Sequence, residues 1–174
     1  MSKAVLKHTF AFIVAASLAS AQSPPAQATV TIGGKKLTIN YSAPSVRGRQ
    51  VFGDGGVISK DPTYPVWRAG ANSATTLITE GDLDIGGLKV PKGPYTLFVL
   101  LGQPQWKLIV NKQTGQWGLS YDQSKDLGRV NMTMSKPAAP VETFKIILDG
   151  TGGNKGKLTM EWADTAGSVP FTVQ

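Results

Sequence analysis

The chain has 174 residues, a formal net charge of +7, 20 glycines, no cysteine and one histidine, His8. His8 falls within the predicted leader, so the mature chain would have neither thiol nor imidazole. It could then build neither Ser-His-Asp nor Cys-His catalysis, nor the usual zinc, copper and haem sites. We therefore expect no metal and no organic cofactor, we disfavour an enzyme, and the singly scattered lysines argue against a nucleic-acid partner.

The first 21 residues have the pattern of a signal peptide. Lys3 and Lys7 precede an apolar run, and Ala19-Ser20-Ala21 supplies the small residues that signal peptidase reads. This predicts export, to the periplasm or the medium. No later stretch approaches the roughly 20 apolar residues of a membrane helix, so we expect no membrane insertion after processing. Residues 22–28 should form a flexible tether and residues 29–174 a single domain.

Short runs of β-branched and aromatic residues follow, separated by glycine and proline. Gly33-Gly34 predicts a two-residue hairpin turn, and the continuous apolar run at 97–101 predicts a strand buried on both faces. No window has a helical period. The pattern predicts an all-β, antiparallel β-sandwich, with a jelly-roll-like or barrel-like variant left open. The expected strands are 28–32, 35–42, 75–80, 82–85, 88–91, 94–101, 106–111, 128–134, 142–148, 157–163 and 169–173.

Residues 43–66 form a long segment with few strand signals. Loops longer than about 12–15 residues within a compact domain are usually functional or disordered. This segment holds Phe52 and Tyr64, and Trp67 follows it, so we expect it to pack against the domain. Its glycine-rich stretch, residues 52–56, lacks the lysine and the following helix of a phosphate-binding loop.

Several segments resemble a known family. "YSAPSVRGRQVFG", "VWRAGANSAT", "IGGLKVPKGPYTLF", "WKLIVNK", "QWG", "ETFKI" and "GKLTMEWADT" occur in this order. In these the chain resembles the bacterial domain-of-unknown-function family 2911 (DUF2911) of small exported proteins, over essentially all of the chain after the leader. The resemblance implies a β-rich exported domain. It implies no activity, because the family has no established function.

Arginine placement suggests one binding site. Arg47 and Arg49 flank a glycine and would share a face if extended, as would Arg68 and Asn72 on either side of Gly70. Guanidinium groups suit two-point recognition of anions. We expect a pocket for a small polar or anionic ligand, or an envelope glycan. Its candidate residues are Arg47, Arg49, Arg68, Asn72, Thr75, Tyr41 and Glu142.

A structural role for these arginines stays open. Arg68 could stack on Trp67 and pair with one carboxylate, for which Glu142 is the expected partner. In that case the protein would be a structural or interaction module of the cell envelope, and the arginines would only fix the long loop to the sheet. The sequence leaves the oligomeric state open.

A carboxylate-dependent hydrolase is the enzymatic alternative. Glycosidases use two carboxyl groups about 5 to 9.5 Å apart, and Asp82 with Asp84, or Glu142, could supply them. Asp82 and Asp84 also stand between glycines, where hairpin charges are usually solvated. Tryptophans could form a sugar-stacking platform, although aromatic side chains mostly serve burial. The candidates are Trp106, Trp162 and Trp117, of which Trp117 is the strongest candidate for exposure.

Overall fold

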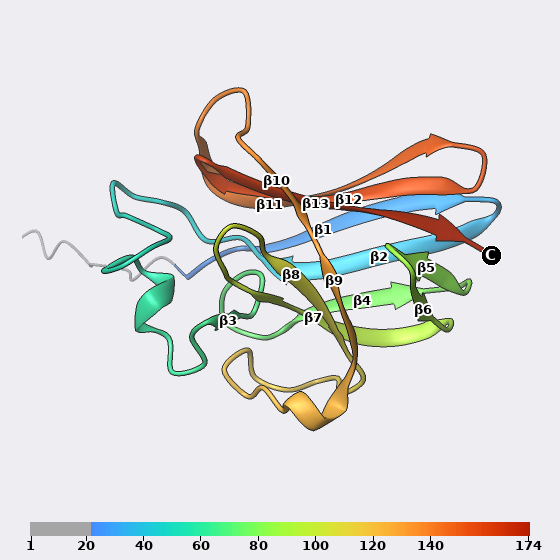
Figure 1. Ribbon diagram of the computed structural model, residues 1–174, viewed down its shortest axis with the longest axis horizontal. Helices are drawn as coiled ribbons and strands as arrows, with labels where there is room; N and C mark the ends of the chain where they lie inside the picture. Colours follow the sequence, from blue (N-terminus) through green and yellow to red (C-terminus); the bar gives the residue numbers. More distant parts are fainter. Residues whose placement is uncertain (1–21) are drawn as a thin grey trace, which may run out of the picture.

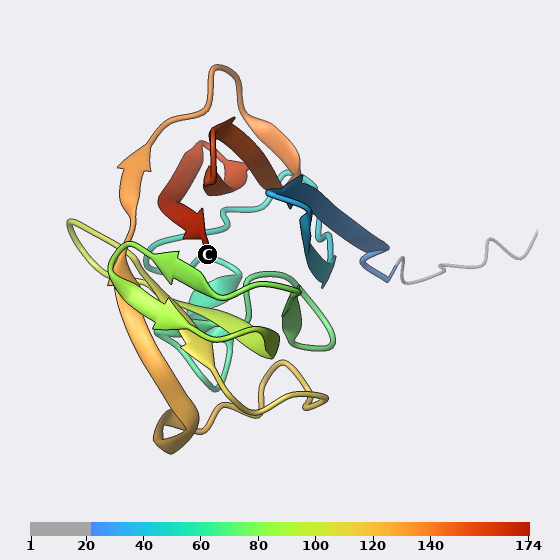
Figure 2. The same cartoon turned by 90° about the vertical axis from the view of Figure 1, so that its right-hand side faces the viewer.

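The computed structural model describes residues 22–174, so the predicted signal peptide lies outside the described residues. Two antiparallel sheets face each other across one core, as Figures 1 and 2 show. The predicted all-β sandwich is confirmed. Within residues 22–174, no helix is long and apolar enough to cross a membrane.

The first sheet has the strand order β1-β2-β4-β7-β8-β9, with β3 also paired to β7. Its strands are β1 (Pro25–Ile32), β2 (Lys35–Ser42), β3 (Val66–Trp67), β4 (Thr75–Thr79), β7 (Gly93–Leu100), β8 (Lys107–Asn111) and β9 (Asp126–Asn131). The second sheet has the order β11-β12-β13-β5-β6, with β10 also paired to β13. Its strands are β5 (Leu83–Ile85), β6 (Leu88–Val90), β10 (Thr133–Ser135), β11 (Val141–Gly152), β12 (Lys155–Ala163) and β13 (Thr165–Val173). Two short 3₁₀ helices, η1 (Ile58–Lys60) and η2 (Gln123–Lys125), lie in loops.

Alternation of apolar and polar residues along each strand determines which face lies against the core. In β2, Leu37 and Ile39 are buried in the core, while Lys36 and Asn40 point to solvent. At the sides of the sandwich, β1 lies beside β11 and β6 beside β9, so the sheets approach each other along both edges. This covers strand edges that would otherwise present unpaired backbone groups.

The N-terminal strand corrects one boundary. The predicted tether, residues 22–28, is wrong for its second half, because β1 begins at Pro25, which is paired with Ser42. The strand continues to this point because alternate residues Ala26 and Ala28 are at least partly buried. The hairpin turn at Gly33-Gly34 is confirmed, with φ of 57° and 76°.

Strand β7 is buried on both faces, as predicted. Leu97 and Val99 point into the main core. Phe98 points the other way into a second, smaller core with Ile109, against which Tyr121 packs from the loop 112–125. This loop therefore covers part of the outer face of the first sheet (Figure 1, bottom).

The long loop packs at the end of the sandwich opposite the C-terminus (Figure 1, left). Phe52 inserts among three tryptophans, with ring centroids 5.7 Å from Trp67, 4.8 Å from Trp106 and 5.9 Å from Trp162. Trp67 belongs to the first sheet and Trp162 to the second, so Phe52 ties the loop to both. The predicted packing is confirmed for Phe52, whereas Tyr64 remains 45 % exposed.

Candidate functional site

The segment after β3 is not the extended chain that the sequence suggested. β3 ends at Trp67, and Ala69 and Asn72 have φ of 50° and 59°. The predicted alternation of faces over 67–72 is therefore wrong. The backbone turns here because the Thr75 hydroxyl donates to the Ala69 carbonyl at 2.7 Å, and the Trp67 indole donates to the Gly70 carbonyl at 3.1 Å.

Arg68 pairs with Asp61 at 3.4 Å, so the expected pairing with Glu142 is wrong. Its side chain is 14 % exposed, and its Nε has no hydrogen-bond partner among the described residues. Gly118 lies directly against the Arg68 side chain, where even a methyl group would clash. Asn72 donates weakly, at 3.5 Å, to the Ser23 carbonyl. These contacts connect loops to one another.

The first arginine pair lies in a turn. Arg47 and the glycine after it have φ of 50° and 66°, so Arg47 and Arg49 do not share a strand face and that expectation is wrong. The Arg49 guanidinium donates to the carbonyls of Val46 at 3.0 Å and Ser45 at 2.7 Å. The Glu142 carboxylate accepts from the backbone N–H of Arg47 at 2.9 Å, which fixes this turn to β11.

The remaining candidates also make structural contacts. Thr75 is fully buried, and the Tyr41 hydroxyl accepts from the Ile146 N–H at 3.1 Å, joining the two sheets. Tyr41 lines one small hollow and Glu142 a different one. The seven candidate residues are thus not brought together around a common cavity.

The two hairpin carboxylates are engaged locally. Asp84 pairs with Lys89 at 2.8 Å and accepts from the Gly87 N–H at 2.7 Å, and these contacts lower the pKa of Asp84. Asp82 accepts from the Lys92 N–H at 2.7 Å. Each carboxylate therefore closes a turn. Among residues 22–174, no cluster of three His, Cys, Asp or Glu residues could hold a metal ion.

A cleft opens instead at the loop end of the sandwich. It consists of two adjoining hollows of about 360 Å³ each, which share four lining residues, and we call it the end cleft. The shared residues are Phe52, Gly102, Gln103 and Trp106. The first hollow adds Gly53, Asp54, Ile58, Ser59, Tyr64 and Leu101. The second adds Pro104, Met134, Ser135, Lys136, Asp164 and Thr165.

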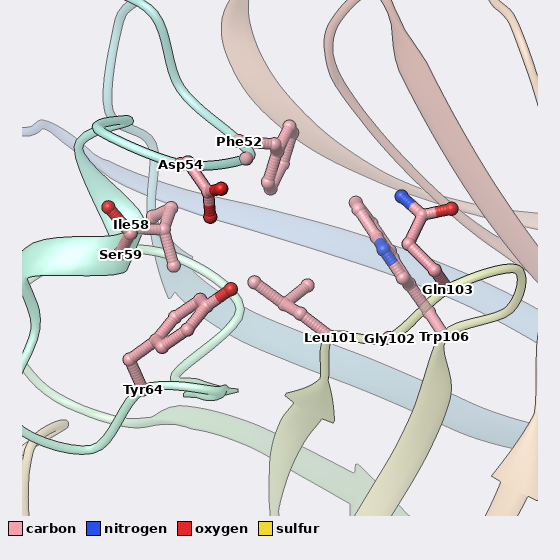
Figure 3. A pocket seen from close by; sticks show the side chains of 10 residues that line it. Phe52, Asp54, Ile58, Ser59, Tyr64, Leu101, Gly102, Gln103 and Trp106 are labelled. Carbon is pink, nitrogen blue, oxygen red and sulfur yellow. The ribbon is translucent and has the colours of Figure 1, made fainter.

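The first hollow has an apolar wall and polar groups facing it. Figure 3 shows the Asp54 carboxylate and the Tyr64 hydroxyl pointing into the hollow from two parts of the long loop. Leu101 and Trp106, from the connection between β7 and β8, face them. Among the described residues, neither the Asp54 carboxylate nor the Gln103 amide has a hydrogen-bond partner of its own.

The sequence prediction missed this cleft. Its residues come from four separate segments of the chain, residues 52–64, 101–106, 134–136 and 164–165. Tertiary contacts such as the packing of Phe52 on Trp106 and the hydrogen bond from the Leu101 N–H to the Pro65 carbonyl bring the first two together. The available signal was the unpatterned length of the loop together with its aromatic residues. Trp117 is 53 % exposed, as the sequence suggested. It lies next to Ser73, however, and does not line the end cleft.

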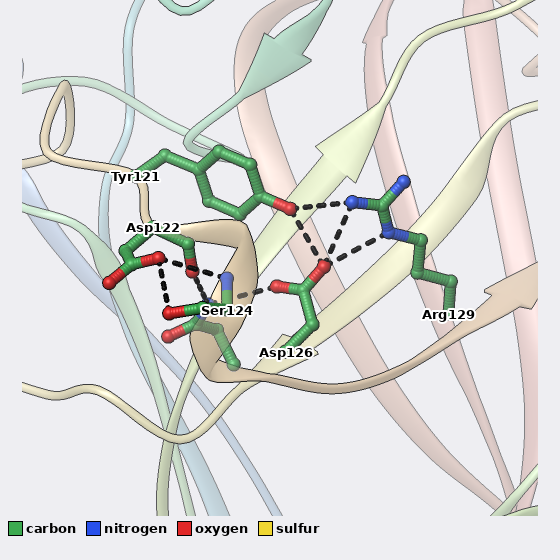
Figure 4. Close-up of polar contacts among 6 residues, drawn as sticks. Tyr121, Asp122, Ser124, Asp126 and Arg129 are labelled. Carbon is green, nitrogen blue, oxygen red and sulfur yellow. Dashed lines mark hydrogen bonds and ion pairs between the residues drawn. The ribbon is translucent and has the colours of Figure 1, made fainter.

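Hydrogen bonds among its own residues hold together a second polar cluster, shown in Figure 4. The Tyr121 hydroxyl donates to Asp126 at 2.7 Å and accepts from Arg129 at 2.8 Å. Asn111 donates to the other Asp126 oxygen at 2.9 Å. Burial, followed by the hydrogen bond to Asp126, raises the pKa of Tyr121 to about 12. The cluster fixes the loop 112–125 to β8 and β9.

Comparisons with known proteins place the chain in a family. No curated protein and no solved structure matches it. A family model described as "Protein of unknown function (DUF2911)" matches residues 23–171, which cover both sheets and the end cleft. The chain belongs to the DUF2911 family.

Proposed function

We propose that the protein is a non-enzymatic binding module that takes a small polyhydroxylated ligand, such as a short glycan, in the end cleft. The observation that carries this proposal is the combination, in one open cleft, of an aromatic wall with polar groups that other described residues leave unpaired. With the predicted signal peptide, the module would act in the periplasm or outside the cell.

The size and lining of the cleft fit such a ligand. Each hollow, at about 360 Å³, lies within the usual range of small-molecule sites. Tyr64 presents an exposed aromatic ring, a surface on which the C–H face of a sugar can pack. The Gln103 amide can donate to and accept from sugar hydroxyls, and the Asp54 carboxylate can accept from them.

The charges of the cleft favour a hydroxylated ligand over an anion. No lysine or arginine lines the first hollow, and the second contains Lys136 together with Asp164. The arginines that suggested anion binding have their contacts elsewhere. Each hollow has one carboxylate, Asp54 in the first and Asp164 in the second. Glycoside hydrolysis uses a pair that faces one substrate bond, so this separation supports binding over catalysis.

Calorimetric titration with a panel of short oligosaccharides tests the proposal. We expect binding by the parent protein and a loss of about five- to twelvefold in affinity for Tyr64→Ala, because a stacked ring contributes roughly 1–1.5 kcal/mol. Tyr64 is exposed, so this variant should fold normally. Trp117→Ala, an exposed aromatic outside the cleft, is the matched control and should bind like the parent. No binding by any panel member, or full affinity in Tyr64→Ala, would overturn the proposal.

A further inference from the structure

The first hollow has a negative lining, although the protein as a whole carries a net positive charge. The chain carries 18 lysines and arginines against 11 aspartates and glutamates. The first hollow nevertheless has Asp54 as its one charged lining residue. Three aromatic residues, Phe52, Tyr64 and Trp106, also line it, and the face of an aromatic ring attracts a cation. The local field therefore favours a cation on a surface that otherwise repels one.

The backbone turn that carries Asp54 is fixed by the Gln50 side chain. The Gln50 side chain donates to the carbonyl oxygens of both Phe52, at 3.0 Å, and Asp54, at 3.1 Å. Gly53 and Gly55, on either side of Asp54, have φ of 81° and 76°, a conformation that favours glycine. This turn presents the carboxylate toward the hollow, as Figure 3 shows.

Two hydroxyl groups line the same hollow. An alkylammonium group has three N–H donors and needs an acceptor for each. The Ser59 hydroxyl donates its proton to the Gly56 carbonyl at 2.8 Å. The Tyr64 hydroxyl points into the hollow from the other side (Figure 3). The Asp54 carboxylate and the Tyr64 hydroxyl thus offer one charged and one neutral acceptor inside the hollow, while the Ser59 hydroxyl is turned toward the Gly56 carbonyl.

We propose that the first hollow selects a ligand bearing a protonated amine, such as an amino sugar, which the Asp54 carboxylate binds beside the aromatic wall. This inference rests on the proposed function, since it specifies the chemistry of the ligand in the same cleft. The amine is the feature recognised, and the sugar ring packs on the exposed aromatic face.

A matched pair of probes tests the amine directly. Oligomers of glucosamine and of N-acetylglucosamine with equal chain length differ in whether the nitrogen is charged. By calorimetry, at a pH where the amines are protonated, we expect the glucosamine oligomer to bind about tenfold tighter, since one charge-assisted contact contributes about 1.4 kcal/mol. That preference should weaken as salt is added.

Asp54→Asn removes the charge and keeps the shape of the side chain. In this variant we expect the glucosamine oligomer to bind no better than the acetylated one, because the preference for the amine depends on the charge of Asp54. Asp164→Asn, in the second hollow, is the control and should keep the parent's preference. Equal binding of both oligomers by the parent, or a preference that survives in Asp54→Asn, overturns the amine inference and leaves the proposed function standing. Failure of both oligomers and of the whole oligosaccharide panel overturns both.

Discussion

At the scale of single residues, the buried hydroxyl of Tyr121 gives the protein a pH dependence. The pKa of this tyrosine is raised from 10.0 to about 12, so the folded state disfavours its ionised form. The stability that results is fully present below pH 10 and is lost as the pH rises through about 12. An absorbance titration of tyrosinate should show one late ionisation near pH 12 that Tyr121→Phe lacks. If the parent and variant titrated alike above pH 10, burial and the hydrogen bond to Asp126 would not raise the pKa of this tyrosine.

Arg68 shows, on the same scale, why charge partners are hard to predict. Its partner, Asp61, lies only seven residues away, inside the long loop. Nothing in the pattern of that loop distinguishes Asp61 from the other carboxylates, and the prediction chose Glu142 on a regular strand. Glu142 instead accepts from a backbone N–H. The partner of Arg68 thus depends on the conformation of the long loop, which hydrophobic periodicity in the sequence does not predict.

At the scale of strands, the glycine of β12 opposite Phe171 has a packing role. Gly156 is paired with Phe171 across β12 and β13, and a Cβ on Gly156 would lie 2.3 Å from the Phe171 ring. Phe171 is buried, so it cannot move freely. Gly156→Ala should cost about 1–3 kcal/mol of unfolding free energy, measured by urea denaturation.

A second glycine provides the control for this substitution. Gly150 ends the regular pairing of β11, and its nearest neighbouring atom would be 3.9 Å from an added Cβ. Gly150→Ala should therefore leave the stability unchanged or raise it slightly. Equal losses in both variants would show that backbone flexibility, and not the Phe171 ring, explains the effect.

The strands were largely predictable from the sequence, whereas the end cleft was not. Alternating residues such as Leu37 and Ile39 in β2 mark the buried face wherever the chain is extended. After Trp67 the chain turns because of hydrogen bonds from the Trp67 indole and the Thr75 hydroxyl. Such side-chain to backbone contacts are specific to the folded structure. The common strand face predicted for Arg68 and Asn72 across this turn is accordingly not formed.

At the scale of the whole molecule, the end cleft depends on how the long loop is attached. Phe52 is its aromatic anchor, in contact with tryptophans of both sheets, and it also lines both hollows. The loop between Gly53 and Tyr64 otherwise has largely local hydrogen bonds, such as those within η1. Phe52 is thus a main link between cleft and fold, beside the buried Ile58 and the Asp61–Arg68 pair. Loosening Phe52 should open the loop before the sheets separate.

Phe52→Ala tests this coupling. We expect a loss of about 2–4 kcal/mol in unfolding free energy, because a large ring leaves an aromatic cluster. Limited trypsin digestion should then cut after Lys60, an exposed residue of the loop, faster than in the parent under conditions where both remain folded. Tyr64→Ala, which removes an exposed ring from the same loop, should digest like the parent. Because the loop carries Asp54 to the cleft, Phe52→Ala should also lose binding of the oligosaccharide probes, while unchanged digestion after Lys60 would mean that the loop is held by other contacts.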